Sequence, residues 1–152
     1  MVHETYELTF FPGGQKMYAQ ISESKFEQNL SNVVEKSALW FKENQHTRLS
    51  LRLVMYFNES QSGTLKRHYA CILDESMECL ISVLPLLANR LATRVSEVVE
   101  VPQLKIRPIL SMIVYWLIQA HTGNTNELPN RDEMLDILSG ILTNQFMSFR
   151  GA

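Results

Sequence analysis

The sequence has little of what marks several specialised classes of protein. Two of its 152 residues are cysteines, Cys71 and Cys79, and only six are glycines. Two cysteines are too few to form a stabilising framework of disulfide bonds in a domain of this size, so we expect a reduced, cytoplasmic protein. The chain also contains no G-x-S-x-G nucleophile motif, no phosphate-binding glycine loop and no dinucleotide-binding fingerprint.

Positive charge and long apolar runs are scarce as well. The net charge is -2, whereas proteins that bind nucleic acid over much of their surface carry a basic excess. The first ten residues, MVHETYELTF, hold neither the basic segment nor the apolar run of a signal peptide. The stretch ILSMIVYWLI at 109–118 is only about half as long as the ~20 apolar residues that cross a bilayer. We therefore expect a soluble chain with no membrane segment, in which this stretch is the central helix of the core.

Aspartate is rare in this chain. Only Asp74, Asp132 and Asp136 occur, and two of the three fall in the first turns of predicted helices. A hydrolytic or phosphotransfer site built on paired carboxylates is hard to assemble from such a set. We predict that the protein is not an enzyme and uses no cofactor and no metal.

The N-terminal segment predicts a β-hairpin. Residues 6–10 alternate between apolar and polar side chains, which is the period of a half-buried strand. Gly13 and Gly14 can adopt the positive φ values that a two-residue turn requires. Folding about this turn would pair residues 6–10 with residues 17–21 and place their apolar side chains on one face.

A helix and a second pair of strands are predicted next. Ser24 and Glu27 have the spacing of a capping box, and apolar residues recur at helical spacing from Phe26 to Phe41. The segments TRLSLRLVMYF at 47–57 and TLKRHYACIL at 64–73 are interpreted as strands joined by the polar turn NESQSG. In the first of them, apolar side chains occupy alternate positions.

The remaining half of the chain predicts helices. Asp74 would cap the first, whose apolar stripe continues to about residue 99 and which Pro85 should kink or break. Residues 100–108 are interpreted as a connector that ends at Pro108 in the first turn of the central helix.

Asn130 and Glu133 have capping-box spacing and predict the start of the last helix. The predicted fold is therefore a single α+β domain over residues 1–152. Two β-hairpins flank a helix (ββαββ, antiparallel sheet) over residues 1–73, and a helical C-terminal half follows over residues 74–152.

Histidine and cysteine side chains offer two candidate sites. His121, near the end of the central helix, could act as a general base or could simply complement the helix dipole. The second interpretation is favoured, because no nucleophile can be matched to this histidine. His68, Cys71 and Cys79 could bind a metal ion, but residues three apart on a strand point to opposite faces. We therefore predict two buried cysteines and no metal site.

One face of the predicted sheet suggests an alternative function. A basic and aromatic sheet face can bind single-stranded nucleic acid through phosphate contacts and base stacking. The residues that would form this face are Arg48, Arg52, Tyr56, Lys66 and Arg67. A solvated sheet face with cross-strand hydrogen bonds is the favoured interpretation.

The leading hypothesis is a non-enzymatic protein–protein interaction module, such as an adaptor, an inhibitor or a chaperone-like subunit. The missing catalytic constellation and the surplus of apolar helical surface both favour it, and its partner would be another protein or a second copy in a homo-oligomer. Methionine and aromatic side chains adapt to partner surfaces and gather in the last helix. The candidate partner-binding residues are Met134, Leu138, Leu142, Phe146 and Phe149.

Overall fold

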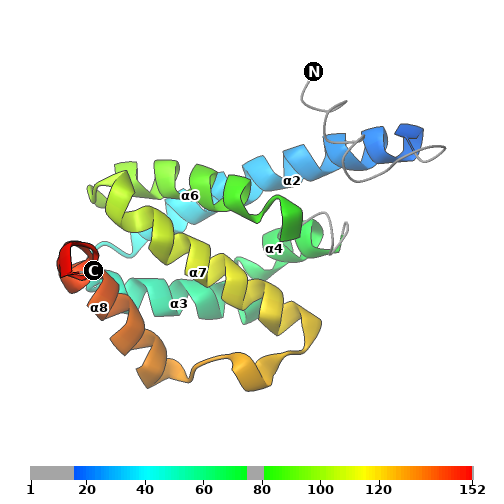
Figure 1. Ribbon diagram of the computed structural model, residues 1–152. Helices are drawn as coiled ribbons and strands as arrows, with labels where there is room; N and C mark the ends of the chain where they lie inside the picture. The colour runs from blue at the N-terminus through cyan, green and yellow to red at the C-terminus, as the bar shows by residue number, and fades with distance from the viewer. Residues whose placement is uncertain (1–15, 75–80, 152) are drawn as a thin grey trace.

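The described part of the protein is built from helices alone. The computed structural model describes the backbone of residues 16–74 and 81–151, and the side chains of residues 25–74 and 81–143. Within these residues there is no strand (Figure 1). The elements are α2 (Lys16–Glu43), α3 (Leu49–Ser62), α4 (Lys66–Leu73), α6 (Leu84–Val99), α7 (Gln103–Thr122), the 3-10 helix η2 (Thr125–Glu127) and α8 (Arg131–Gly151).

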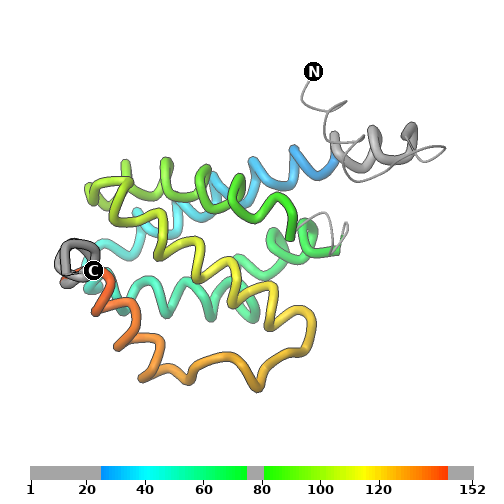
Figure 2. The backbone as a smooth tube through the Cα atoms, viewed as in Figure 1, coloured from blue at the N-terminus to red at the C-terminus, as the bar shows by residue number. Residues whose placement is uncertain are grey.

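Helix α7 lies at the centre of the arrangement. It packs against α6 on one side and against α3 and α8 on the other, while α2 contacts α6 and α4. The chain reverses direction between α6 and α7, so these two helices lie side by side (Figure 2). Two ion pairs join α6 to α2: Arg90 to Glu27 at 2.9 Å and Arg94 to Glu35 at 3.1 Å. One cluster of buried side chains contains residues from each of the α-helices named above.

Helix α2 confirms the helix predicted from Phe26 to Phe41, although it begins earlier, at Lys16. The residues predicted to form its inner stripe are buried: Phe26, Leu30, Val33, Val34, Ser37 and Phe41. Residues 17–21, predicted as a strand, belong to this helix, so the N-terminal hairpin prediction is wrong. A two-stranded hairpin is marginal alone, whereas a nucleated helix gains one hydrogen bond per added residue. Residues 6–10 and the Gly13-Gly14 turn lie outside the described residues.

The second predicted strand pair is also wrong, because residues 49–62 and 66–73 form α3 and α4. The apolar positions Leu49, Leu53 and Phe57 are four apart, and this spacing fits both a strand face and a helix face. The deciding residues are Tyr56 and Ser60, which are buried beside Phe57 and fit only the helical spacing. The α+β prediction is therefore corrected to a bundle-like fold of helices over the described residues.

Prolines and caps set the limits of the later helices. Asp74 follows the end of α4 at Leu73, and the first turns of the helix that Asp74 is predicted to cap lie outside the described residues. Pro85 lies in the first turn of α6, which begins at Leu84. A proline in a first turn costs no hydrogen bond, because the amide there has no helical partner. Helix α7 already starts at Gln103, so Pro108 lies inside it and not in its first turn.

The central helix and the last capping box are confirmed. Residues 109–118 lie within α7, where most side chains are buried. At the start of α8 the Glu133 amide donates to Asn130 Oδ1 at 2.9 Å, and the Asn130 amide donates to Glu133 Oε1 at 2.8 Å. These reciprocal bonds satisfy two donors that a helix start otherwise leaves unpaired.

Candidate pocket between α3, α4 and α7

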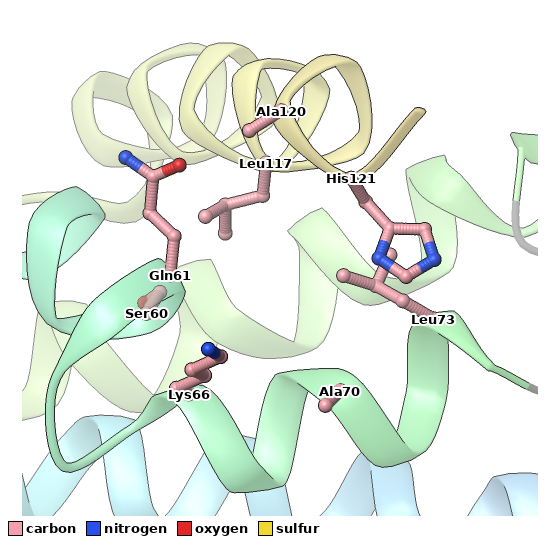
Figure 3. A pocket seen from close by; sticks show the side chains of 8 residues that line it. All are labelled: Ser60, Gln61, Lys66, Ala70, Leu73, Leu117, Ala120 and His121. Carbon is pink, nitrogen blue, oxygen red and sulfur yellow. The ribbon is translucent and has the colours of Figure 1, made fainter. Parts of the chain in front are cut away.

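A pocket of about 290 Å³ lies where the end of α3, the length of α4 and the last turns of α7 meet (Figure 3). Its wall combines small or apolar side chains with a few polar ones. The lining residues are Ser60, Gln61, Lys66, Ala70, Leu73, Leu117, Ala120 and His121. Ligand sites in proteins commonly have this composition, with an apolar surface and a few convergent polar groups.

A tight connection between α3 and α4 forms one wall of the pocket. The Gly63 amide donates to the Glu59 carbonyl at 3.1 Å and ends α3. Glu59 Oε2 then accepts from the Thr64 amide at 3.4 Å and from Thr64 Oγ1 at 3.2 Å. These contacts hold the turn between Gln61 at the end of α3 and Lys66 at the start of α4.

The C-terminal end of α7 forms the opposite wall. Gly123 adopts a left-handed conformation with φ of 86°, and the Asn124 amide donates to the Gln119 carbonyl at 3.0 Å. This arrangement is a Schellman-type helix end. It places His121 in the last turn of α7, where its Nε2 lies 3.9 Å from Asp74 Oδ1 at the end of α4.

The charge of the pocket wall is positive. Lys66 is exposed and makes no ion pair with any described residue. None of the described residues that line the pocket is acidic, and Asp74 approaches only from beyond His121. In Figure 3 the Lys66 ammonium lies below Leu117 in the view, with Gln61 and His121 on opposite sides.

A cluster of hydroxyl groups is sealed in the core one turn of α3 away from the pocket. Ser37 Oγ and the Tyr56 hydroxyl are 2.7 Å apart, and Tyr56 also hydrogen-bonds to Tyr69. Burial raises the pKa of Tyr56 to about 12, and burial together with Tyr56 raises the pKa of Tyr69 well above its usual value. Both phenols are therefore neutral at physiological pH.

Ser60 lies between this hydroxyl cluster and the pocket. It is buried, and its Oγ makes no hydrogen bond of standard geometry with the described residues. Ser60 lies near the Tyr56 hydroxyl and lowers the pKa of Tyr56, but burial raises that pKa by more. Among the described residues of the pocket wall, Ser60 therefore contributes a buried hydroxyl without a standard hydrogen bond.

A second hollow of about 250 Å³ lies between α2 and the start of α4. Its wall carries Lys36 and Glu43, which have opposite charges, and the indole of Trp40. His68 also lines it, and burial lowers the pKa of this imidazole, with smaller contributions from the cations Lys36 and Arg67. The mixture of charges in this wall favours no single class of ligand.

The residues proposed to bind nucleic acid do not share a face. Arg52 is buried, its Nη1 donates to the Phe41 carbonyl at 3.3 Å, and burial lowers its pKa. Tyr56 is fully buried in the hydroxyl cluster. Arg48 precedes α3, whereas Lys66 and Arg67 are exposed at the start of α4. The sheet that would have aligned these five residues is absent from the described part of the chain, so that interpretation loses its basis.

The candidate partner-binding residues of the last helix lie in different environments. Met134 and Leu138 are buried in the core, and Leu142 is partly buried against it. Phe146 and Phe149 lie outside the residues whose side chains are described. On the described stretch of α8 the predicted stripe therefore closes this chain's own core.

The candidate metal ligands and the candidate general base form no site among the described residues. Cys71 is exposed on α4, contrary to the expectation of a buried cysteine, and Cys79 lies outside the described residues. No group of three metal-ligand side chains occurs among the described residues. No serine, threonine or cysteine in that part of the chain hydrogen-bonds to a histidine, so the general-base hypothesis for His121 has no visible nucleophile.

Nothing in the sequence indicates the pocket itself. Among the described lining residues, His121 alone is predicted as a catalytic candidate. Lys66 is predicted to lie on a sheet face, whereas the structure places it at the start of α4. Ser60, Gln61 and Leu117 carry no motif, and the lining comes from three separate helices. The one available signal was that Ser60 is a polar residue at helical spacing from the buried residues Tyr56 and Phe57.

No described helix is both long enough and apolar enough to cross a membrane. Comparisons of the chain with protein-family models, with curated proteins and with solved structures found no match.

Proposed function

We propose that this chain is a non-enzymatic interaction module that associates with a second copy of itself through the outer side of α7. The proposal is supported by one observation above all: from Pro108 to Ala120 the side of α7 that faces solvent carries no charged residue, and the exposed Arg107 lies just before this stretch. A helix at the surface of a protein normally places charged and polar residues on its solvent side. An exposed side without them is typical of a protein–protein interface.

Leu104 and Tyr115 mark this outer side. Their exposed fractions are 63% and 47%, which are high for large apolar residues. Leu104 and Tyr115 are eleven residues apart, which is just over three full turns of helix, so the two side chains point in nearly the same direction. Pro108 and Ser111 lie on the same line between them and are partly exposed. From Pro108 to Ala120 the helix contains no charged residue.

A two-fold axis would suit such a surface. In a symmetric dimer the same surface of each copy meets the other, so one uncharged helix side is sufficient for both partners. Tyr115 can bury its ring and still hydrogen-bond through its hydroxyl at the edge of the contact, which explains why tyrosine is frequent in interfaces. The residues of α8 that lie in the core are not needed for this contact.

Light scattering after size exclusion tests the proposal. The wild-type chain should elute with the mass of a dimer, and Tyr115→Glu should elute as a monomer, because a carboxylate in an apolar contact is costly to desolvate. Leu39→Glu is the matched control, since Leu39 is 48% exposed but lies on α2. This variant should stay dimeric, and circular dichroism should show both variants folded.

Two results would overturn the proposal. The first is a wild-type chain that remains monomeric at its highest soluble concentration. The second is equal dissociation by Tyr115→Glu and Leu39→Glu in folded protein, which would show that the outer side of α7 has no special part in association.

A further inference from the structure

We propose that the pocket between α3, α4 and α7 binds a small carboxylate with an apolar body. This function is separate from self-association, because the pocket and the outer side of α7 share no residue. Leu117 and Ala120 line the pocket, whereas Leu104 and Tyr115 mark the outer side.

The charge of the wall selects an anion. Lys66 lines the pocket and lacks an ion pair within the described part of the chain. The described lining contains no acidic residue that would compete for this ammonium. A carboxylate beside Lys66 would form a charge-assisted hydrogen bond, which is roughly twice as strong as a neutral one.

The apolar part of the wall selects a ligand with hydrocarbon surface. Leu117 is buried at the back of the pocket, and Leu73, Ala70 and Ala120 are partly exposed around it. Inorganic phosphate would leave this surface in contact with water and would find only one lysine. A ligand with an aliphatic chain or a ring would cover it, and the gain scales with the apolar area removed from water.

The remaining polar groups give the ligand a second point of attachment. The buried Ser60 hydroxyl lacks a hydrogen bond of standard geometry, and the Gln61 side chain extends along the same wall toward α7. An amide and a hydroxyl can each donate or accept, so they can bind a carboxylate oxygen that Lys66 leaves free. His121 closes the far side of the pocket.

The volume limits the size of the ligand. About 290 Å³ is close to the lower end of the range for ligand sites in proteins. At roughly 30 Å³ for each water-sized group, the pocket accommodates a molecule of roughly ten non-hydrogen atoms. Benzoate is of this size, and a ligand so small should bind with a dissociation constant on the order of 0.1–1 mM.

Benzoate titrations followed by two-dimensional amide NMR test the proposal on the full chain. Benzoate should shift the amide signals of Gln61, Lys66, Leu73 and Ala120 in a saturable way. Benzamide, which has the same shape without the charge, should bind roughly tenfold more weakly or not at all. Inorganic phosphate at equal ionic strength should produce no saturable shifts at these residues.

Substitutions separate the pocket from general surface charge. Lys66→Met should weaken benzoate binding roughly tenfold, whereas Lys66→Arg should retain most of it. Arg67→Met is the matched control, because Arg67 is the neighbouring exposed cation and does not line the pocket. Ala120→Leu should abolish binding by filling the space.

Three results would overturn the proposal: no saturable shifts with benzoate, equal weakening by Lys66→Met and Arg67→Met, or phosphate binding as tight as benzoate binding. The amide spectrum of each variant shows whether it is folded. If Lys66→Met alone were unfolded, Ala120→Leu and the comparison of benzoate with benzamide would still decide the matter.

Discussion

Two polar regions lie next to each other where α3 packs against α4, and they differ in how their polar groups are satisfied. In the hydroxyl cluster, Ser37, Tyr56 and Tyr69 hydrogen-bond to one another and are shielded from water. In the pocket, the Lys66 ammonium has no ion pair with a described residue, and the buried Ser60 hydroxyl has no standard hydrogen bond.

The difference separates a structural role from a binding role. Buried polar groups that satisfy one another specify how helices pack and leave nothing for a ligand. Polar groups that a fold leaves unsatisfied beside an apolar surface lower stability unless something else binds them. Substitutions in the hydroxyl cluster should therefore change the free energy of unfolding, whereas substitutions in the pocket should change ligand binding.

The largest expected effect comes from removing a ring of the hydroxyl cluster. Tyr69 is fully buried, so Tyr69→Ala should lower the free energy of unfolding by about 3–5 kcal/mol, as for other buried aromatic residues. Urea unfolding followed by circular dichroism measures this change. Lys66→Ala on the same helix should change stability by less than about 0.5 kcal/mol, because this side chain is exposed. Similar losses for the two variants would remove the distinction between the regions.

Alkaline pH should weaken the hydroxyl cluster next. The pKa of Tyr56 is raised to about 12 in the folded protein, mainly by burial, whereas a tyrosine in the unfolded chain titrates near 10.0. The folded state therefore holds this proton more tightly. The contribution that this bound proton makes to stability is complete below about pH 10 and is lost as the pH rises through about 12.

The loss from Tyr56 should approach about 1.4 kcal/mol for each pH unit within this interval. The raised pKa of Tyr69 acts in the same direction. Urea midpoints measured between neutral pH and about pH 11 test this expectation, with Tyr56→Phe as the comparison. The variant should be less stable at neutral pH but should lose less stability on alkalinisation. Parallel pH profiles would show that the buried phenols do not cause the loss.

The helices predicted correctly from sequence have local signals that no other structure satisfies. The capping box of Asn130 and Glu133 is made within one turn, and the stripe of α2 recurs over many turns. The prediction of a strand in place of α3 is wrong because Leu49, Leu53 and Phe57 fit the spacing of both a strand and a helix. Burial of Tyr56 decided between them, and burial depends on contacts with distant segments.

The pocket could not be predicted from sequence for a related reason. Its wall joins the end of α3 to α4 and to the last turns of α7, and nothing in the sequence states that these segments meet. Ser60 and Lys66 are six residues apart along the chain, but their proximity in the pocket depends on the tight turn at Gly63. His121 enters only because α7 ends beside Asp74.

The smallest expected effect gives the sharpest contrast, because it compares two buried serines. Ser37→Ala removes a partner of Tyr56 and should lower the free energy of unfolding by about 1–2 kcal/mol. Ser60→Ala removes a hydroxyl without a standard hydrogen bond, so its effect should lie within about 0.5 kcal/mol of zero, or be slightly stabilising. Both serines are buried and both substitutions remove a single oxygen atom, so burial alone cannot explain a difference. Urea unfolding of the two variants side by side measures the difference directly. If Ser60→Ala proved as destabilising as Ser37→Ala, Ser60 would belong to the hydroxyl cluster, and the pocket would offer a ligand only Lys66, Gln61 and His121 as polar partners.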